Sequence, residues 1–185
     1  ENNNCREDGS HQDGWSTWDI VNEENLGNYP FPADGAIFLE DNVWVNGQID
    51  TARLTIGSSR DIIVDNDLIY SNYDGQDAIG LIARRNVNIG LDSEDDLRID
   101  GALVAQDGRV GRYYYSNKCI AGYSRATITL YGMIATYDRY NFSYDDGTGY
   151  QERFISYDPN LSFNPPPFFP SVSDQYVTVS WDEIK

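Results

Sequence analysis

Short apolar runs recur through the middle of the chain, and their length limits the folds that the chain can adopt. Between residues 35 and 135 each run holds three to five residues, and Gly, Asn or Asp separates it from the next. Runs this short do not make helices of ordinary length, whereas β-branched residues bounded by turn residues are typical of strands. The sequence therefore predicts an all-β fold without long helices.

A second pattern links these runs. Four segments share the order apolar, variable, Gly or Asn, variable, apolar: residues 45–49, 64–68, 99–103 and 130–134. Gly and Asn enter left-handed backbone conformations cheaply, so their recurrence between strands predicts a bend that turns the same way each time. Gly47 and Asn66 lie 19 residues apart, and this spacing favours coils of roughly 18 residues.

These two patterns predict a right-handed parallel β-helix, or β-solenoid, of about five to six coils. The alternative is a β-sandwich, which also has many short strands. We expect one structural domain with three parts. Residues 1–34 are polar and predict an irregular N-terminal cap, residues 35–136 form the coils, and residues 137–185 form an aromatic and Pro-rich C-terminal extension. Its Pro-rich stretch, 165–170, is expected to lie back along the solenoid, and its alternating run, 176–181, to form a final strand.

The order of motifs resembles a known family. The segment Gly80-Leu81-Ile82-Ala83 is followed by the Pro-rich stretch and by a terminal Ser180-Trp181. This order resembles the C-terminal β-solenoid region of bacterial PilX-like, minor-pilin-like proteins associated with type IV pili, over about residues 35–184. The resemblance implies a surface or pilus-tip protein, and it brings no set of catalytic residues.

The charge of the chain argues against several partners. The 185 residues include 13 basic and 30 acidic side chains, which gives a formal net charge of −17. So much negative charge repels nucleic acid and anionic membrane surfaces. No stretch approaches the roughly 20 apolar residues that span a bilayer, and we expect the chain not to be membrane-embedded.

The composition favours export, with a single Met, few Lys and many Tyr, Asn and Asp residues. We predict an extracellular or bacterial cell-surface location, and we expect an export signal to have preceded Glu1. The chain has two cysteines, Cys5 and Cys119. An exported chain favours a disulfide between them, and the alternative is two free thiols.

Two acidic loops are candidate metal sites. The first holds Asp92, Glu94, Asp95 and Asp96, and the second holds Asp145 and Asp146. Crowded carboxylates suit Ca²⁺, which takes 6–8 oxygen ligands. The alternative for both loops is a hydrated acidic surface without a bound cation.

Tyrosines are the candidate ligand-binding residues. The chain has 14 of them, and we single out Tyr70, Tyr73, Tyr113 and Tyr115, because exposed rings stack on sugars or on other rings. The alternative is that these rings pack within the structure.

Three functions fit these observations. The leading one is a non-catalytic extracellular surface or pilus-associated module for adhesion or structure, binding a glycan or surface and pilus proteins. The second is a β-helix polysaccharide lyase or hydrolase, for which Asp65 and Asp67 with Arg84 and Arg85 offer a candidate site. The third is a subunit that self-associates into an extracellular filament. His11 is the one histidine, which argues against a Ser-His-Asp triad and against a zinc site.

Overall fold

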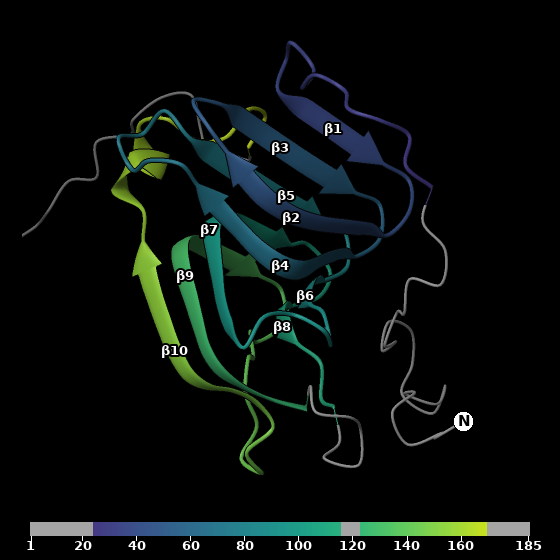
Figure 1. Ribbon diagram of the computed structural model, residues 1–185, viewed down its shortest axis with the longest axis vertical. Coiled ribbons are helices and arrows are strands. Elements are labelled where there is room, and N and C mark those ends of the chain that lie inside the picture. Colours follow the sequence, from purple (N-terminus) through teal and green to yellow (C-terminus); the bar gives the residue numbers. More distant parts are fainter. Residues whose placement is uncertain (1–23, 116–122, 170–185) are drawn as a thin grey trace, which may run out of the picture.

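The computed structural model describes residues 24–115 and 123–169, and in this part of the chain it shows a parallel β-sheet with almost no helix (Figure 1). All strand pairings among the ten strands are parallel. This confirms the all-β prediction and contradicts the β-sandwich alternative, whose sheets are antiparallel. The strands are β1 (Ala36–Leu39), β2 (Val43–Ile49), β3 (Arg53–Ser58), β4 (Ile62–Tyr70), β5 (Ala78–Ala83), β6 (Val87–Ile89), β7 (Asp96–Ala105), β8 (Val110–Arg112), β9 (Ser124–Thr136) and β10 (Gly149–Tyr157).

The pairings group the strands into three rows. The first row contains β1, β3, β5 and the C-terminal halves of β7 and β9. The second row contains the N-terminal halves of β2 and β4, then β6 and β8. The third row contains the C-terminal halves of β2 and β4, the N-terminal halves of β7 and β9, and β10. In Figure 1, β7, β9 and β10 lie side by side in this third row.

The distance along the chain between paired strands is uneven. Ala36 pairs with Thr55, an offset of 19 residues, and Thr55 pairs with Gly80, an offset of 25. Asp96 pairs with Thr127, an offset of 31. The predicted repeat of about 18 residues is therefore wrong beyond the first offset. The strands keep register while the loops between them vary in length, because loops at the surface tolerate insertions that the paired strands do not.

The longer strands bend at glycines. β7 has 10 residues and β9 has 13, and each passes from the third row to the first at one glycine. Gly101 has φ 157° and Gly132 has φ 154°, and Gly47 within β2 has φ 117°. The predicted glycine bends are confirmed at these three positions. The predicted strand length of three to five residues is wrong there, because pairing continues through the bend and joins two apolar runs into one strand.

The bend predicted at Asn66 is wrong in form. Asn66 does not have a positive φ. The ladder shifts register after the pair Val45–Val64, so that Gly47 pairs with Leu68. An irregularity in the ladder therefore makes this bend, rather than a left-handed residue.

The core lies between the rows and consists of aliphatic side chains in register. Leu68 pairs with Ile99, which pairs with Leu130, and all three are at most 4% exposed. Ile62, Val87 and Val110 form a second such ladder, fully buried. Each buried side chain of this size contributes about 1.5–3 kcal/mol from the removal of apolar surface from water. The stability of the fold therefore rests on contacts between successive layers.

The sheet continues past the predicted boundary at residue 136. β10 pairs with β9 from Gly149 to Tyr157, and the short 3-10 helix η2 (Pro159–Ser162) follows it. The chain then returns over the first row, where the Thr55 hydroxyl donates to the carbonyl of Pro167 and Pro166 lies against Gly80. This confirms that the described part of the Pro-rich stretch lies back along the strands.

Some predictions fall outside the described residues. These are the disulfide between Cys5 and Cys119, the final strand at 176–181 and residues 1–23 of the predicted cap.

Candidate functional site

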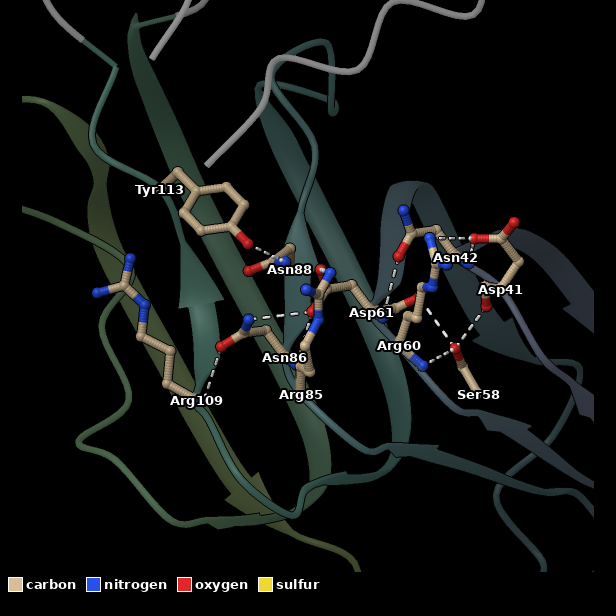
Figure 2. Close-up of polar contacts among 10 residues, drawn as sticks. All are labelled: Asp41, Asn42, Ser58, Arg60, Asp61, Arg85, Asn86, Asn88, Arg109 and Tyr113. Carbon is tan, nitrogen blue, oxygen red and sulfur yellow. Dashed lines mark hydrogen bonds and ion pairs between the residues drawn. The ribbon is translucent and has the colours of Figure 1, made fainter. Parts of the chain in front are cut away.

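A ladder of polar side chains holds the turn that leads into the second row (Figure 2). The side-chain oxygen of Asn42 accepts the backbone N–H of Asp61 at 3.2 Å. Asp61 in turn accepts the N–H of Asn86 at 2.9 Å, and Asn86 accepts the N–H of Arg109 at 3.0 Å. Each side chain thus satisfies a backbone donor one layer further along, which ties four layers together. We call Asn42, Asp61, Asn86 and Arg109 the polar corner.

Asp61 is the most deeply buried member of the polar corner, at 0% exposed. Its carboxylate accepts the Asn86 side-chain amide at 3.0 Å and forms an ion pair with Arg85 at 2.7 Å. A buried carboxylate needs such partners, because burial without them is costly. Asp61 therefore serves the structure and is not available to a ligand.

Arginines recur beside the polar corner in successive layers. Arg60 and Arg85 each precede the register pair Ile62–Val87 by two residues. Arg109 and Arg139 each precede the bridge between Gly111 and Asn141 by two residues. Neighbouring strands lie about 4.8 Å apart, so Arg60 and Arg85 start one layer apart, as do Arg109 and Arg139. Between Arg85 and Arg109 the column shifts by one residue, because Val87 pairs with Val110.

Two open depressions adjoin at this place, with volumes of about 700 and 580 Å³. They share Arg109 and Arg139 in their walls. We call their union the arginine groove. Its charged lining consists of five arginines and three aspartates: Arg84, Arg85, Arg109, Arg139, Arg153, Asp107, Asp138 and Asp145. The local formal charge is therefore +2, in a chain whose net charge is −17.

The arginines of the groove differ in their contacts. Arg84 faces Asp107 at 3.4 Å, with both side chains about two-thirds exposed. Arg109 donates to the Tyr144 hydroxyl at 3.4 Å and lies over the Tyr113 ring, with its guanidinium carbon 5.6 Å from the ring centroid. Figure 2 shows Arg109 reaching toward the side on which Tyr113 lies.

Arg139 and Arg153 are the exposed arginines at the far end of the groove. Arg153 donates to the Ser143 hydroxyl, and within the described residues Arg139 forms no ion pair. Tyr140, which is 47% exposed, lines the same depression. Guanidinium groups bind carboxylate, sulfate or phosphate through two parallel hydrogen bonds, and tyrosine rings stack on flat partners. The groove thus has the chemistry of an anion site with an aromatic wall.

The structure places three of the four predicted ligand tyrosines inside the protein. Tyr70 is 3% exposed, Tyr113 is 4% and Tyr115 is 3%. The expectation that these rings are free to stack on a ligand is therefore wrong for all three. Tyr70 packs in the main core, and burial raises the pKa of Tyr70 and of Tyr113 well above the ordinary value. Tyr115 packs against the Arg112 guanidinium, 4.8 Å from its ring centroid.

Tyr73 is the exposed member of the predicted set, at 47%. Its hydroxyl donates to buried Asp100 at 2.8 Å, and its ring meets Tyr131 edge-on with centroids 5.2 Å apart. Desolvation and this hydrogen bond to Asp100 raise the pKa of Tyr73. The four predicted tyrosines therefore form no common surface, although Tyr113 lines the arginine groove.

The first acidic loop is exposed at Asp92, Glu94, Asp95 and Asp96. Asp95 accepts the backbone N–H of Ala126 at 3.1 Å. Within the described residues no three His, Cys, Asp or Glu side chains gather as a metal site. Calcium binding at this loop stays a prediction.

The second acidic loop is held by its own hydrogen bonds. Asp146 accepts the Tyr114 hydroxyl at 2.8 Å and both the hydroxyl and the N–H of Thr148. These bonds, that from Tyr114 first, hold the pKa of Asp146 below its ordinary value. Asp145 is exposed and lines the arginine groove.

The candidate enzyme site is not assembled as the sequence suggested. Asp65 accepts the Asn46 side-chain amide at 2.9 Å, and Asp67 accepts the backbone N–H of Arg98 at 2.7 Å. Arg85 instead contacts Asp61. Asp65, Asp67 and Arg85 thus each bind a different partner and do not contact one another.

Sequence reasoning missed Arg109, Arg139 and Arg153 as site residues. A signal for the first two was present, because an arginine comes immediately or shortly before successive second-row segments, at positions 60, 85, 109 and 139. That signal becomes readable once the register is known. Arg153 lies on β10, inside the segment that the sequence predicts to be the C-terminal extension.

Comparison of the chain with protein-family models, with curated proteins and with solved structures finds no match. The resemblance to PilX-like proteins therefore stays a prediction. The described residues hold no helix with the length and apolar character needed to cross a membrane.

Proposed function

We propose that the protein is a non-catalytic binding module built on a β-solenoid, and that it acts at the bacterial surface. The chain visits the first, second and third rows in that order and then returns to the first, which supports a β-helix of about five turns. Connections between parallel strands are right-handed in about 98% of cases, so the β-helix is right-handed.

The observation that carries the proposal is the arginine groove. It lies beside the polar corner, where Asn42, Asp61 and Asn86 fix the backbone from one layer to the next. Guanidinium, phenol and amide groups therefore project from a rigid frame into an open depression. Preorganised polar and aromatic groups of this kind suit recognition of a glycan, which offers hydroxyl groups and flat sugar faces.

A location at the cell surface or on a pilus follows from the composition and from the family resemblance. The excess of Asn, Tyr and Asp and the scarcity of Lys and Met support an exported protein. The order of the motifs from Gly80 to Trp181 supports a pilus-associated role. In this role the module attaches a cell or a filament to a glycan-bearing surface.

The proposal is tested by binding of the purified chain to an immobilised panel of neutral and acidic polysaccharides. We expect retention on at least one glycan and no release of reducing ends or unsaturated sugars. The double variant Arg139→Gln/Arg153→Gln should lose the retention. Arg60→Gln is the matched control, because Arg60 carries the same charge beside the polar corner but does not line the groove. Turnover of any glycan would support the enzyme alternative, and absence of retention on the whole panel would contradict the proposed function.

A further inference from the structure

We propose that the ligand of the arginine groove is an acidic polysaccharide with a carboxylate on each sugar unit, and that its chain runs across the strands from layer to layer. This inference rests on the proposed function and names the class of glycan. Its three supports are the local charge, the placement of the arginines by layer, and the distribution of the carboxylates that neutralise them.

The first support is charge. Five of the eleven arginines of the chain line one groove, although acidic residues outnumber basic ones by 30 to 13. The surrounding negative charge acts on a ligand only over the Debye length, about 10 Å at 0.1 M salt. Within the groove, where five arginines face three aspartates, the local electrostatic interaction therefore favours an anionic ligand. A neutral glycan gains little from groups whose strongest bonds go to anions, whereas a carboxylate accepts two parallel hydrogen bonds from each guanidinium.

The second support is spacing. Arg109 and Arg139 occupy level positions in two successive layers of the second row, about 4.8 Å apart, and Arg85 lies one layer earlier, displaced by one residue along the strand. A polymer that carries one carboxylate per sugar offers anionic groups at a short regular repeat along its length. Such a chain, laid across the strands, meets one arginine after another. A ligand with a single anionic group would use only one of them.

The third support is the gradient of neutralisation along the groove. Arg60 pairs with Asp41 at 3.1 Å, and Arg85 pairs with buried Asp61 at 2.7 Å. Further along, Arg139 is exposed and forms no ion pair within the described residues, and Arg153 bonds a serine hydroxyl. The protein's own carboxylates thus occupy the arginines of the early layers. The later layers offer arginines to an external carboxylate, so Arg139 and Arg153 should be the main contacts.

The experiment compares two forms of one polymer. Polygalacturonate and its fully methyl-esterified form have the same sugar backbone, and only the first is charged. Binding of each to the full chain is measured by biolayer interferometry in 0.1 M NaCl with a chelator present, so that no divalent cation bridges the acidic loops to the polymer. We expect polygalacturonate to bind at least about tenfold more tightly, and its affinity to fall about tenfold or more in Arg139→Gln/Arg153→Gln. Arg60→Gln should change the affinity less than about twofold.

The outcomes separate this inference from the proposed function. Equal binding of the two polymers, with loss in the double variant, would overturn the acidic ligand and leave the glycan-binding function standing. Binding of polygalacturonate that the double variant retains would overturn the assignment to this groove. Failure of both polymers to bind, while a neutral glycan of the panel is retained, would overturn the inference alone. Circular dichroism and urea unfolding of each variant show that it is folded, so a loss of binding reports on the groove.

Discussion

Two corners of the molecule are built by different means. At the polar corner, side chains make the turn, because Asn42, Asp61 and Asn86 accept backbone N–H groups from the next layer. At the corner between the third and first rows, the backbone itself makes the turn at Gly101 and Gly132. We call the latter the glycine corner. A Cβ added to Gly132 would lie 1.8 Å from the carbonyl oxygen of Gly101, so backbone lies directly on backbone there.

The difference explains why the groove lies where it does. The glycine corner is covered by its own side chains, since Tyr73 packs on Tyr131 and the Tyr131 hydroxyl donates to buried Asp158. The polar corner is fixed from within by short side chains, so the neighbouring positions are free to carry long ones that point outward. A corner held by buried hydrogen bonds can therefore carry a binding surface without a change in its backbone.

The largest effect is expected from Gly132→Ala. The new methyl group collides with the Gly101 carbonyl, and φ 154° is already unfavourable for a side chain. We expect a loss of about 3 kcal/mol or more in the free energy of unfolding, measured in urea. Gly47→Ala is the control, because φ is 117° there but no atom lies within 4 Å of the added Cβ. Its cost should be about 1 kcal/mol, and equal costs for the two variants would contradict backbone-on-backbone packing at the glycine corner.

The next effect is expected from Asp61→Ala at the polar corner. The substitution leaves the N–H of Asn86 without its acceptor and the Arg85 guanidinium without its carboxylate. Because Arg85 is partly exposed, we expect a loss of about 2–3 kcal/mol in urea unfolding. Asp41→Ala removes the exposed partner of Arg60 and should cost less than about 1 kcal/mol. A cost for Asp61→Ala as small as that of Asp41→Ala would show that the ladder does not fix the corner.

A smaller effect concerns acid stability near the glycine corner. Burial of Asp77 disfavours its charged form, but the N–H groups of Asn72 and Ala52 and both donors of Ser71 bond its carboxylate and hold its pKa below the ordinary value. A lowered folded pKa stabilises the fold above the unfolded pKa of about 3.9, and the stabilisation disappears as the pH falls through the folded pKa. Asp77→Asn should therefore be less stable than wild type at pH 7, and the gap should narrow at acid pH.

The measurement is urea unfolding at a series of pH values from about 7 down to about 2. Asp107→Asn is the control, since Asp107 is exposed. In this variant the free energy of unfolding should depend on pH as it does in the wild type. A gap that stays constant with pH would mean that the Asp77 carboxylate does not carry this stabilisation.

The smallest effect on stability is expected from the groove itself. Arg139→Gln should change the free energy of unfolding by less than about 0.5 kcal/mol, because Arg139 is exposed and its described surroundings hold no ion pair with it. The same urea titration measures it. A destabilisation above about 1 kcal/mol would show that Arg139 stabilises the fold. It would contradict the view that the polar corner holds the backbone while the groove arginines are available to a ligand.

The all-β class and the glycine bends could be predicted because they depend on local chemistry. Short runs of β-branched residues favour strands, and Gly47, Gly101 and Gly132 sit where only a residue without a side chain adopts the bend at low cost. The repeat length could not be read in the same way. Loops of different lengths carry no local signal of register, so the sequence pattern aligns Asn66 with Gly47 although Gly47 pairs with Leu68.

The candidate site was harder to predict because it depends on register between distant segments. Arg85, Arg109 and Arg139 are far apart in sequence and come together only when the layers stack. The tyrosines misled for the opposite reason. Aromatic residues such as Tyr70 and Tyr113 are typical of ligand surfaces, but Tyr70 is the last residue of β4 and Tyr113 directly follows β8, and both side chains are buried.

The most direct test of the account is a hydrogen-exchange footprint of the full chain with and without saturating polygalacturonate. The account predicts slower exchange in peptides that cover residues 84–86, 107–109, 138–145 and Arg153, which line one groove. Peptides that cover the glycine corner and β1–β3 should be unchanged. Protection centred on Tyr73 and residues 98–101, or on the acidic loop at 92–96, would contradict the central claim that the arginine groove is the binding site.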